Sequence, residues 1–177
     1  MGTDSGETRL VREAQRGSQQ AIADLYTGHW RRAHRAAYLV VHDAAAAEDI
    51  AQDAFLAAID SLDRFDRRRP FGPWLHRIVV NRAIDWTRRE ALRRRAAGDP
   101  EAEAAEPPPP EAIGGELMAA LAGLPAEQRA VIVMRHLLDL SPGEIARALD
   151  LPRGTVNSRL RRGLDALQGL DDVEEPK

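Results

Sequence analysis

The stretch from Arg153 to Arg162 has the side chains and spacing of a surface that reads double-stranded DNA. Arginine can pair bidentately with guanine in the major groove, whereas threonine, serine and asparagine can hold phosphates or bases. Asn157 is the residue of this stretch best suited to adenine. Val156 and Leu160 recur at helical spacing and predict the buried side of the same helix. The candidate DNA contacts on its outer side are Arg153, Thr155, Asn157, Ser158, Arg159 and Arg162.

The residues just before this stretch predict the element that positions it. Ser141 fits the N-cap of a helix of about two turns, Pro142 its first position and Glu144 its third, so that Ser and Glu can form a capping box. A turn at 150–152 separates this helix from the last one, whose apolar face continues to Leu167. A short capped helix, a tight turn and an Arg-faced helix predict a helix-turn-helix. An ordinary bundle with a solvated basic helix is the less favoured alternative.

A second group of side chains suits single-stranded nucleic acid. Holding unstacked bases calls for aromatic platforms beside cations, and the charged loop DRFDRRRPFG at 63–72 supplies both. For Phe71 and for Trp74 just beyond it, core packing is favoured over contact with a base, while Phe65 fits either role equally. The cations of this loop are Arg64, Arg67, Arg68 and Arg69.

A third group lies on a helix predicted from about residue 45 to 62. Its apolar residues follow a period of 3.6, which predicts one buried face; they are Ile50, Ala54, Phe55, Ala58, Ile59 and Leu62. The residues off this stripe form an acidic polar surface consisting of Glu48, Asp49, Gln52, Asp53 and Asp60. From the residues alone, this surface is either a docking site for a basic partner or a solvated face.

The sequence does not indicate catalysis. Its five histidines lack partners at the spacing of a metal site, it has no cysteine, and it has no Gly-rich phosphate loop. We therefore expect that the protein is not an enzyme and that it needs no cofactor or metal ion.

Composition divides the chain into two all-α domains joined by a flexible linker. The acidic, proline-rich segment AAGDPEAEAAEPPPPEA at 96–112 cannot form a core. It separates an N-terminal domain at 7–95 from a C-terminal domain at 113–170, which should contain the helix-turn-helix. The net charge of −3 argues against nucleic acid at first sight. However, residues 1–95 carry 17 Arg against 13 acidic residues, a net charge of +4, so the acidity lies mainly in the linker and the tail.

The location of the protein is also constrained by its sequence. No apolar run approaches the roughly 20 residues that a membrane span needs, and the N-terminus lacks the basic start and apolar core of a signal peptide. The sequence predicts a cytoplasmic protein without membrane insertion.

Three stretches resemble extracytoplasmic-function sigma factors of bacterial RNA polymerase. The run LPAEQRAVIVMRHLLDLSPGEIARALDLPRGTVNSRLRRGLDAL is similar to their C-terminal domain, and AAEDIAQDAFLAAIDSLDRF to their polymerase-binding helix. FGPWLHRIVVNRAIDWTRRE resembles their minus-ten reading helix, with matches at Phe71, Trp74, Leu75, Asn81 and Asp85. The three matches occur in the family's order and cover most of residues 8–168.

The resemblance implies a transcription initiation factor with core RNA polymerase, promoter DNA and an anti-sigma factor as partners. The acidic surface would contact polymerase, and the linker would thread toward its active centre. The minus-thirty-five contacts would be the six residues of the last helix, although the family often has a basic residue where Asn157 stands. The implied minus-ten contacts are Arg64, Phe65, Arg67, Arg68, Arg77, Asn81, Arg82 and Arg88.

Two other functions compete with this prediction. A stand-alone helix-turn-helix regulator should bind its operator as a symmetric dimer, but it leaves residues 45–95 unexplained. A metal-dependent hydrolase on a helical bundle requires a cluster of histidines and carboxylates.

Overall fold

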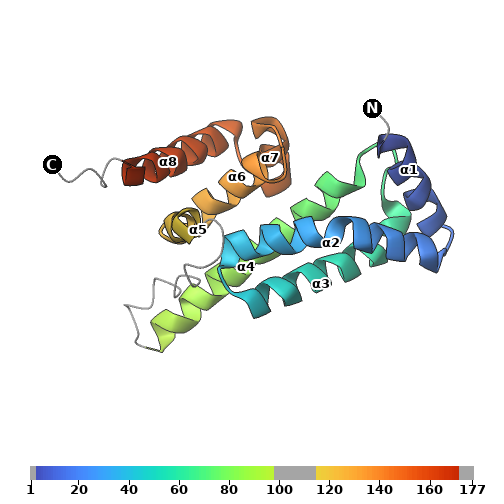
Figure 1. Ribbon diagram of the computed structural model, residues 1–177, viewed down its shortest axis with the longest axis horizontal. Coiled ribbons are helices and arrows are strands. Elements are labelled where there is room, and N and C mark those ends of the chain that lie inside the picture. Colours follow the sequence, from blue (N-terminus) through green and yellow to red (C-terminus); the bar gives the residue numbers. More distant parts are fainter. Residues whose placement is uncertain (1–2, 98–114, 172–177) are drawn as a thin grey trace.

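A computed structural model describes residues 3–97 and 115–171, and all the regular structure in these two ranges is helical (Figure 1). The all-α prediction is thereby confirmed. The N-terminal half contains α1 (Thr3–Ala14), α2 (Gln19–Val41), α3 (Ala44–Asp60), a short 3₁₀ turn η1 (Leu62–Arg64) and α4 (Phe71–Ala96). The C-terminal half contains α5 (Gly115–Ala122), α6 (Ala126–His136), α7 (Pro142–Leu149) and α8 (Arg153–Asp171).

Local signals explain where the first helices begin. Gly17 has a φ of 87°, a left-handed conformation that glycine adopts without strain, and it ends the turn after α1. The next residue, Ser18, is the N-cap of α2 and accepts a hydrogen bond from the backbone of Ala21. Asp43 caps α3 in the same way through Ala46. These caps satisfy backbone N–H groups that have no partner inside the helix.

The core of the N-terminal half lies where α2, α3 and α4 meet, with α1 packed across one end. Small and branched side chains fill it, among them Ala33, Ala37 and Val79, each with no exposed surface. The predicted stripe of α3 is buried except at Ile59, which remains 37% exposed because it lies beside the half-exposed Tyr26 at the rim of a shallow apolar groove. The predicted start of the fourth helix is also two residues late, since α4 begins at Phe71.

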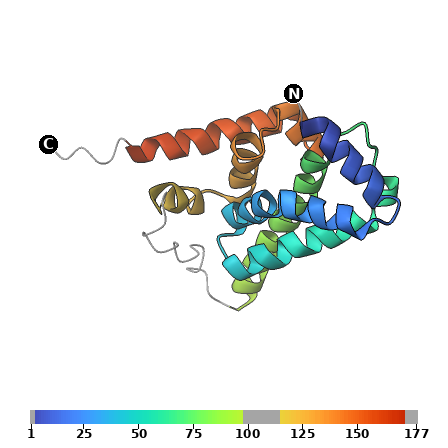
Figure 2. The same cartoon turned by 45° about the vertical axis from the view of Figure 1, so that its right-hand side comes forward.

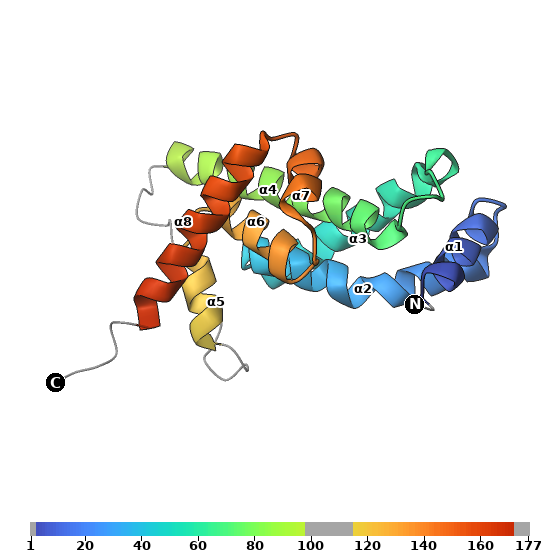
Figure 3. The ribbon, with the colours of Figure 1, turned by 90° about the horizontal axis from the view of Figure 1, so that it is seen from above.

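The C-terminal half is built around α6 and α8. Val131 and Met134 of α6 are fully buried, and so are Ile145 of α7 and Val156 of α8. Figure 3 shows α8 crossing α6 with α7 at one end of the pair.

The two halves lie against each other rather than apart. α6 contacts α2 and α4 of the N-terminal half as well as α8 of its own half. Figures 1 and 2 both show α6 between α8 and the pair formed by α2 and α4. Most of the predicted linker, from residue 98, and the acidic tail lie outside the described residues. None of the described helices is both long enough and apolar enough to cross a membrane.

Candidate nucleic-acid interface

The predicted helix-turn-helix is formed by α7 and α8, and its capping box is present. Ser141 Oγ accepts the backbone N–H of Glu144 at 3.3 Å, and the Glu144 carboxylate accepts the backbone N–H of Ser141 at 2.8 Å. The same carboxylate also accepts the Ser141 hydroxyl, and these bonds hold the pKa of Glu144 below its ordinary value. The box fixes the direction in which α7 enters the motif.

A tight turn then sets the angle of α8. Asp150 adopts the left-handed conformation with a φ of 52°, and its N–H bonds to the carbonyl of Ala146. Leu151 N–H bonds to the same carbonyl at 2.9 Å. On α8, Val156 has no exposed surface and Leu160 is 9% exposed, so this side of the helix is fixed against the core.

The outer side of α8 carries the six predicted DNA contacts. Arg153, Asn157 and Arg162 are exposed, whereas Thr155, Ser158 and Arg159 are half-buried. The hydroxyl of Ser158 donates to the carbonyl of Thr155 at 2.9 Å, and Nε of Arg162 donates to the carbonyl of Ser158 at 3.2 Å. The six side chains therefore lie on one surface, on which Arg153 and Asn157 are among the most accessible.

A glycine that the sequence reasoning did not single out lets α8 approach α6. A Cβ atom at Gly163 would lie 2.6 Å from Cδ1 of Ile132 and 3.6 Å from Cβ of Gln128. Carbon atoms in contact pack at about 3.5–4.0 Å, so only glycine fits here without a shift. An i+7 spacing from Val156 places Gly163 on the buried side of α8, which was the available signal.

The loop at 63–72 exposes its arginines. Arg64, Arg67 and Arg69 are solvent-exposed. Arg68 is also exposed but pairs with Asp66 through Nε to Oδ1 at 3.0 Å and Nη2 to Oδ2 at 3.2 Å. These bonds lower the pKa of Asp66 and raise that of Arg68. The loop thus presents a cationic surface, in part held by its own carboxylate.

Phe65 does not present its ring to solvent. It is 8% exposed, and its ring centroid lies 4.6 Å from that of Trp74 and 6.0 Å from that of Phe71. Gln15 of α1 fixes the loop from below by donating to the carbonyls of Leu62 and Phe65 at 2.8 and 3.1 Å. Phe65 therefore takes the packing role of the two that the sequence allowed, and the predicted minus-ten set loses its aromatic platform in this arrangement.

The first turn of α4 is held by α1, a contact that the sequence reasoning missed. Glu7 Oε2 accepts the backbone N–H of Phe71 at 3.3 Å, and Glu7 Oε1 lies 2.8 Å from Nε2 of His29. Pro70 precedes this turn and gives it no side-chain cap. A carboxylate at a helix N-terminus favourably meets the positive end of the helix dipole.

The four predicted strand contacts on α4 differ in their surroundings. Arg77 is exposed and Arg82 is half-buried. Asn81 donates through Nδ2 to the carbonyl of Ala148 at the end of α7, at 3.2 Å. Arg88 pairs through Nη2 with Glu127 Oε1 at the start of α6, also at 3.2 Å. Two of the four thus contact the C-terminal half.

The acidic surface of α3 is displayed as predicted. Glu48, Asp49, Gln52, Asp53 and Asp60 are all exposed, and Gln52 donates to Glu48 at 3.2 Å. The structure adds an apolar residue to it: Leu56 follows Asp53 by three positions, precedes Asp60 by four, and is 60% exposed. Residues three and four apart are neighbours on a helix, so a large apolar side chain lies among the carboxylates.

One buried cation was not expected from the sequence. Arg129 of α6 is 8% exposed and donates through Nη1 to the carbonyls of Leu121, Ala122 and Leu124 at 3.1–3.3 Å. Burial lowers its pKa to about 10. It caps the end of α5, where helix carbonyls lack partners. In the described parts of the chain, no three His, Cys, Asp or Glu side chains gather closely enough to hold a metal ion.

Two family models match this chain, one on each half. Residues 25–93 match the model described as sigma-70 region 2, and residues 114–167 match sigma-70, region 4. The first match covers the segment that a stand-alone helix-turn-helix regulator would leave unexplained.

Individual proteins match over nearly the full length. The ECF RNA polymerase sigma factor SigW of Bacillus subtilis is 31% identical over 175 residues, covering 90% of this chain and 94% of SigW. The structure of CnrH in complex with the cytosolic domain of CnrY is similar with a TM-score of 0.69 and 29% identity, over 96% of this chain and 99% of CnrH. The sigma factor RpoE of Bartonella quintana, solved with the anti-sigma factor NepR, shares the fold at 23% identity, with a TM-score of 0.67 over 86% of this chain and 98% of RpoE.

Proposed function

Because the chain belongs to the extracytoplasmic-function family of RNA polymerase sigma factors and so directs promoter-specific transcription initiation, we propose that its two halves divide the promoter between them. The C-terminal half reads the minus-thirty-five element, and the N-terminal half binds core polymerase and holds the melted minus-ten strand. The observation that carries this division is the outer side of α8, where six polar residues form one surface above a helix fixed by a capping box.

In the minus-thirty-five element, α8 lies in the major groove. Arg153 and Asn157 reach base edges, because both are exposed near the N-terminal end of α8, the part of a recognition helix that contacts bases. Thr155, Ser158, Arg159 and Arg162 hold the flanking phosphates and fix the register.

In the minus-ten element, α4 and the preceding loop hold the non-template strand. Exposed Arg64, Arg67 and Arg77 neutralise phosphates, and Arg68 joins them when Asp66 releases it. Asn81, Arg82 and Arg88 line α4 beside them. Phe65 supports the loop from within the core rather than stacking on a base.

Core polymerase docks on α3. The acidic surface of Glu48, Asp49, Gln52, Asp53 and Asp60 fits a basic helical partner, and electrostatic complementarity of this kind directs encounter and register. Leu56 supplies an apolar anchor among these charges. Buried apolar anchors surrounded by polar residues carry much of the affinity of protein interfaces.

The proposal extends to regulation and location. CnrH, which this chain resembles over nearly its whole length, was solved with a cytosolic protein segment bound to it. An anti-sigma protein that binds this chain in the cytoplasm is therefore part of the proposed function. No catalytic step and no cofactor is assigned to the chain.

Run-off transcription tests the proposal. Purified chain is added to core RNA polymerase with a library of genomic fragments, and transcripts are sequenced to locate start sites. We expect discrete start sites that share two upstream elements and that vanish without the chain. A matched variant, Asp53→Lys, should lose transcripts by failing to bind polymerase while its circular dichroism stays unchanged. A well-folded chain that yields no specific transcript would contradict the proposal.

A further inference from the structure

The face of α4 assigned above to the minus-ten strand is in contact with the C-terminal half. Asn81 donates to the carbonyl of Ala148 on α7, and Arg88 pairs with Glu127 on α6. An i+7 spacing places Asn81 and Arg88 on the same side of α4. The groups that would hold the strand therefore already have partners within the chain.

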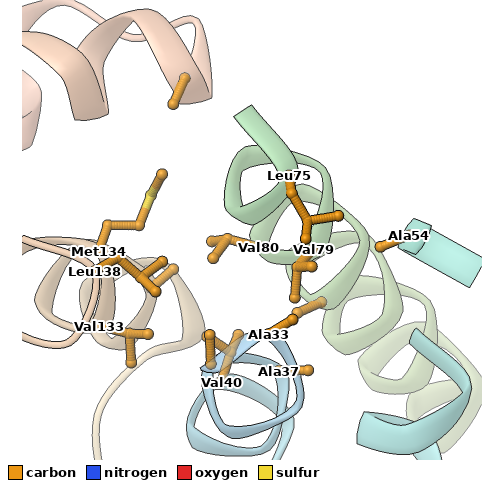
Figure 4. Packing of buried hydrophobic residues seen from close by; sticks show 14 of the residues in the cluster. Ala33, Ala37, Val40, Ala54, Leu75, Val79, Val80, Val133, Met134 and Leu138 are labelled. Atoms are coloured by element: carbon orange, nitrogen blue, oxygen red, sulfur yellow. The ribbon is translucent and has the colours of Figure 1, made fainter. Parts of the chain in front are cut away.

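Apolar packing accompanies these two polar contacts. Val80, next to Asn81 on α4, has no exposed surface, and neither has Val40 on α2. Figure 4 shows both facing Val133, Met134 and Leu138 of the C-terminal half, in one continuous hydrophobic cluster. Burial of apolar surface gives the contact a driving force that ion pairs at a rim do not supply.

A third contact clamps the turn after α6 onto α2. Nε of Arg32 donates to the carbonyl of Leu137 at 3.0 Å, and Nη2 donates both to that carbonyl and to Asp139 Oδ2, the latter at 2.5 Å. Asp139 has a φ of 56°, so the turn is held in a conformation that places its carboxylate beside Arg32. Three separate links thus join the halves.

The contact covers one promoter surface and leaves the other open. Arg153, Asn157 and Arg162 on α8 stay exposed in this arrangement, and so does Arg77 on α4. The covered part is the middle of α4, around Val80 and Asn81. The closed arrangement is therefore selective in what it hides.

We propose that the C-terminal half docks on the strand-binding face of α4, so that domain closure and capture of the minus-ten strand exclude each other. This inference rests on the proposed function, which assigns Asn81 and Arg88 to the strand. The end of α7 occupies the space beside Asn81 that a strand would need. The free chain consequently binds the strand only in the fraction of molecules that are open, and its apparent affinity falls by that fraction.

A reversible crosslink across Arg32 and Asp139 tests the proposal. The chain has no cysteine, so R32C/D139C carries the only two thiols, at side chains that are 46% and 78% exposed. A bismaleimide with a disulfide spacer locks the halves together, and a reductant releases them. Neither residue belongs to the assigned DNA-binding or polymerase-binding sets.

The probe is a fluorescent single-stranded oligonucleotide with the non-template minus-ten sequence of a promoter mapped by run-off transcription. We expect the crosslinked chain to bind it about tenfold or more weakly than the same chain after reductive cleavage. R32C and D139C alone, treated identically, serve as controls and should not change on reduction. A second variant, E127A/D139A, removes two of the links without a crosslinker and should bind the strand more tightly than wild type, whereas Asp24→Ala on α2 should not.

Equal affinity before and after cleavage would overturn the inference, as would failure of R32C/D139C to crosslink within one molecule. Absence of strand binding by the cleaved chain would overturn it too, and the proposed function would stand if the wild-type chain still supports run-off transcription. Loss of run-off transcription in the wild type would instead strike the proposed function itself. The two failures are thereby distinguished.

Discussion

Oε1 of Glu7 lies 2.8 Å from Nε2 of His29, so that a carboxylate of α1 bonds to an imidazole of α2. Burial lowers the pKa of His29, against the opposing pull of the Glu7 charge, and the neutral ring donates Nε2–H to the carboxylate. The other oxygen of Glu7 accepts the first N–H of α4. One side chain of α1 therefore joins the two helices that carry the minus-ten loop at their ends.

Replacing Glu7 by alanine should destabilise the chain. Two half-buried donors, on Phe71 and His29, would lose their acceptor, and each unsatisfied group costs roughly 1–3 kcal/mol. Thermal unfolding of Glu7→Ala should show a clear fall in midpoint. Arg9→Ala on the same helix is the matched control, because the Arg9–Glu13 pair is exposed and pairs of this kind contribute about 0–1 kcal/mol. Equal midpoints for the two variants would contradict the assigned role of Glu7.

Two buried histidines should make stability depend on pH. Burial, with help from Arg129, lowers the pKa of His42 to about 4, and burial lowers that of His76 to about 3. In the unfolded chain both titrate near about 6.5. Above that pH both states are neutral and stability is constant. As the pH falls from there toward 4, only the unfolded chain takes up protons, and the free energy of unfolding drops by about 1.4 kcal/mol per pH unit for each group.

His42→Asn isolates one of these contributions. His42 has a φ of 55°, and asparagine tolerates this left-handed conformation, so the turn should survive. Urea unfolding at several pH values between 4 and 7 should give a shallower loss of stability for the variant than for wild type. Parallel curves would mean that His42 does not titrate as its burial implies.

The close contact of Gly163 with Ile132 predicts a size limit at the crossing of α8 and α6. Gly163→Val should destabilise by roughly 1–3 kcal/mol, the usual cost of overpacking. Ile132→Ala in the same chain should recover part of the loss, because it removes the Cδ1 atom that lies 2.6 Å from the new Cβ. Gly154→Ala is the control, since no atom lies within 4 Å of a Cβ there. Additive effects of the two changes would show that positions 163 and 132 are not coupled.

Local chemistry accounts for what the sequence predicted well. The capping serine at 18, the capping box of Ser141 and Glu144, and the apolar stripes of α3 and α8 each depend on residues within one helix. Their periodicity and caps are visible without knowing what packs where. The exposed positions of the acidic surface and of the arginines on α8 follow from the same periodicity.

Contacts between distant residues account for what the sequence did not predict. Glu7 meets Phe71 across 64 positions and Asn81 meets Ala148 across 67, and no local pattern marks such pairs. The packing of the two halves was missed for the same reason, because the acidic linker indicated only that they are separate pieces. Phe65 was equally open to packing and to base contact until the positions of Trp74 and Gln15 were known.

The exposed side chains at the start of α8 predict loss of minus-thirty-five reading. Arg153→Ala and Asn157→Ala should each weaken promoter binding by the holoenzyme by about 1–3 kcal/mol, the usual worth of a bidentate base contact. Gln168→Ala, exposed in the last turns of α8, should have no effect. Footprinting on promoters with single substitutions in the element measures this. If Asn157 reads a base, its variant should also tolerate the wrong base at one position, whereas uniform weakening at every promoter would assign it to the phosphates.

Leu56 predicts where the polymerase contact concentrates its binding energy. Its side chain is 60% exposed among the carboxylates of α3, a cost to the free chain that docking would remove. Truncation to alanine should weaken binding to core polymerase by about 1–3 kcal/mol, within the range of buried apolar anchors. Leu92 on α4 is 64% exposed but lies far along the chain from the acidic surface, so Leu92→Ala is the matched control. Titration of fluorescently labelled chain with core polymerase, without DNA, measures both. Because exposed leucines contribute little to folding, stability should change in neither variant, and equal polymerase affinity for the two would remove Leu56 from the proposed interface.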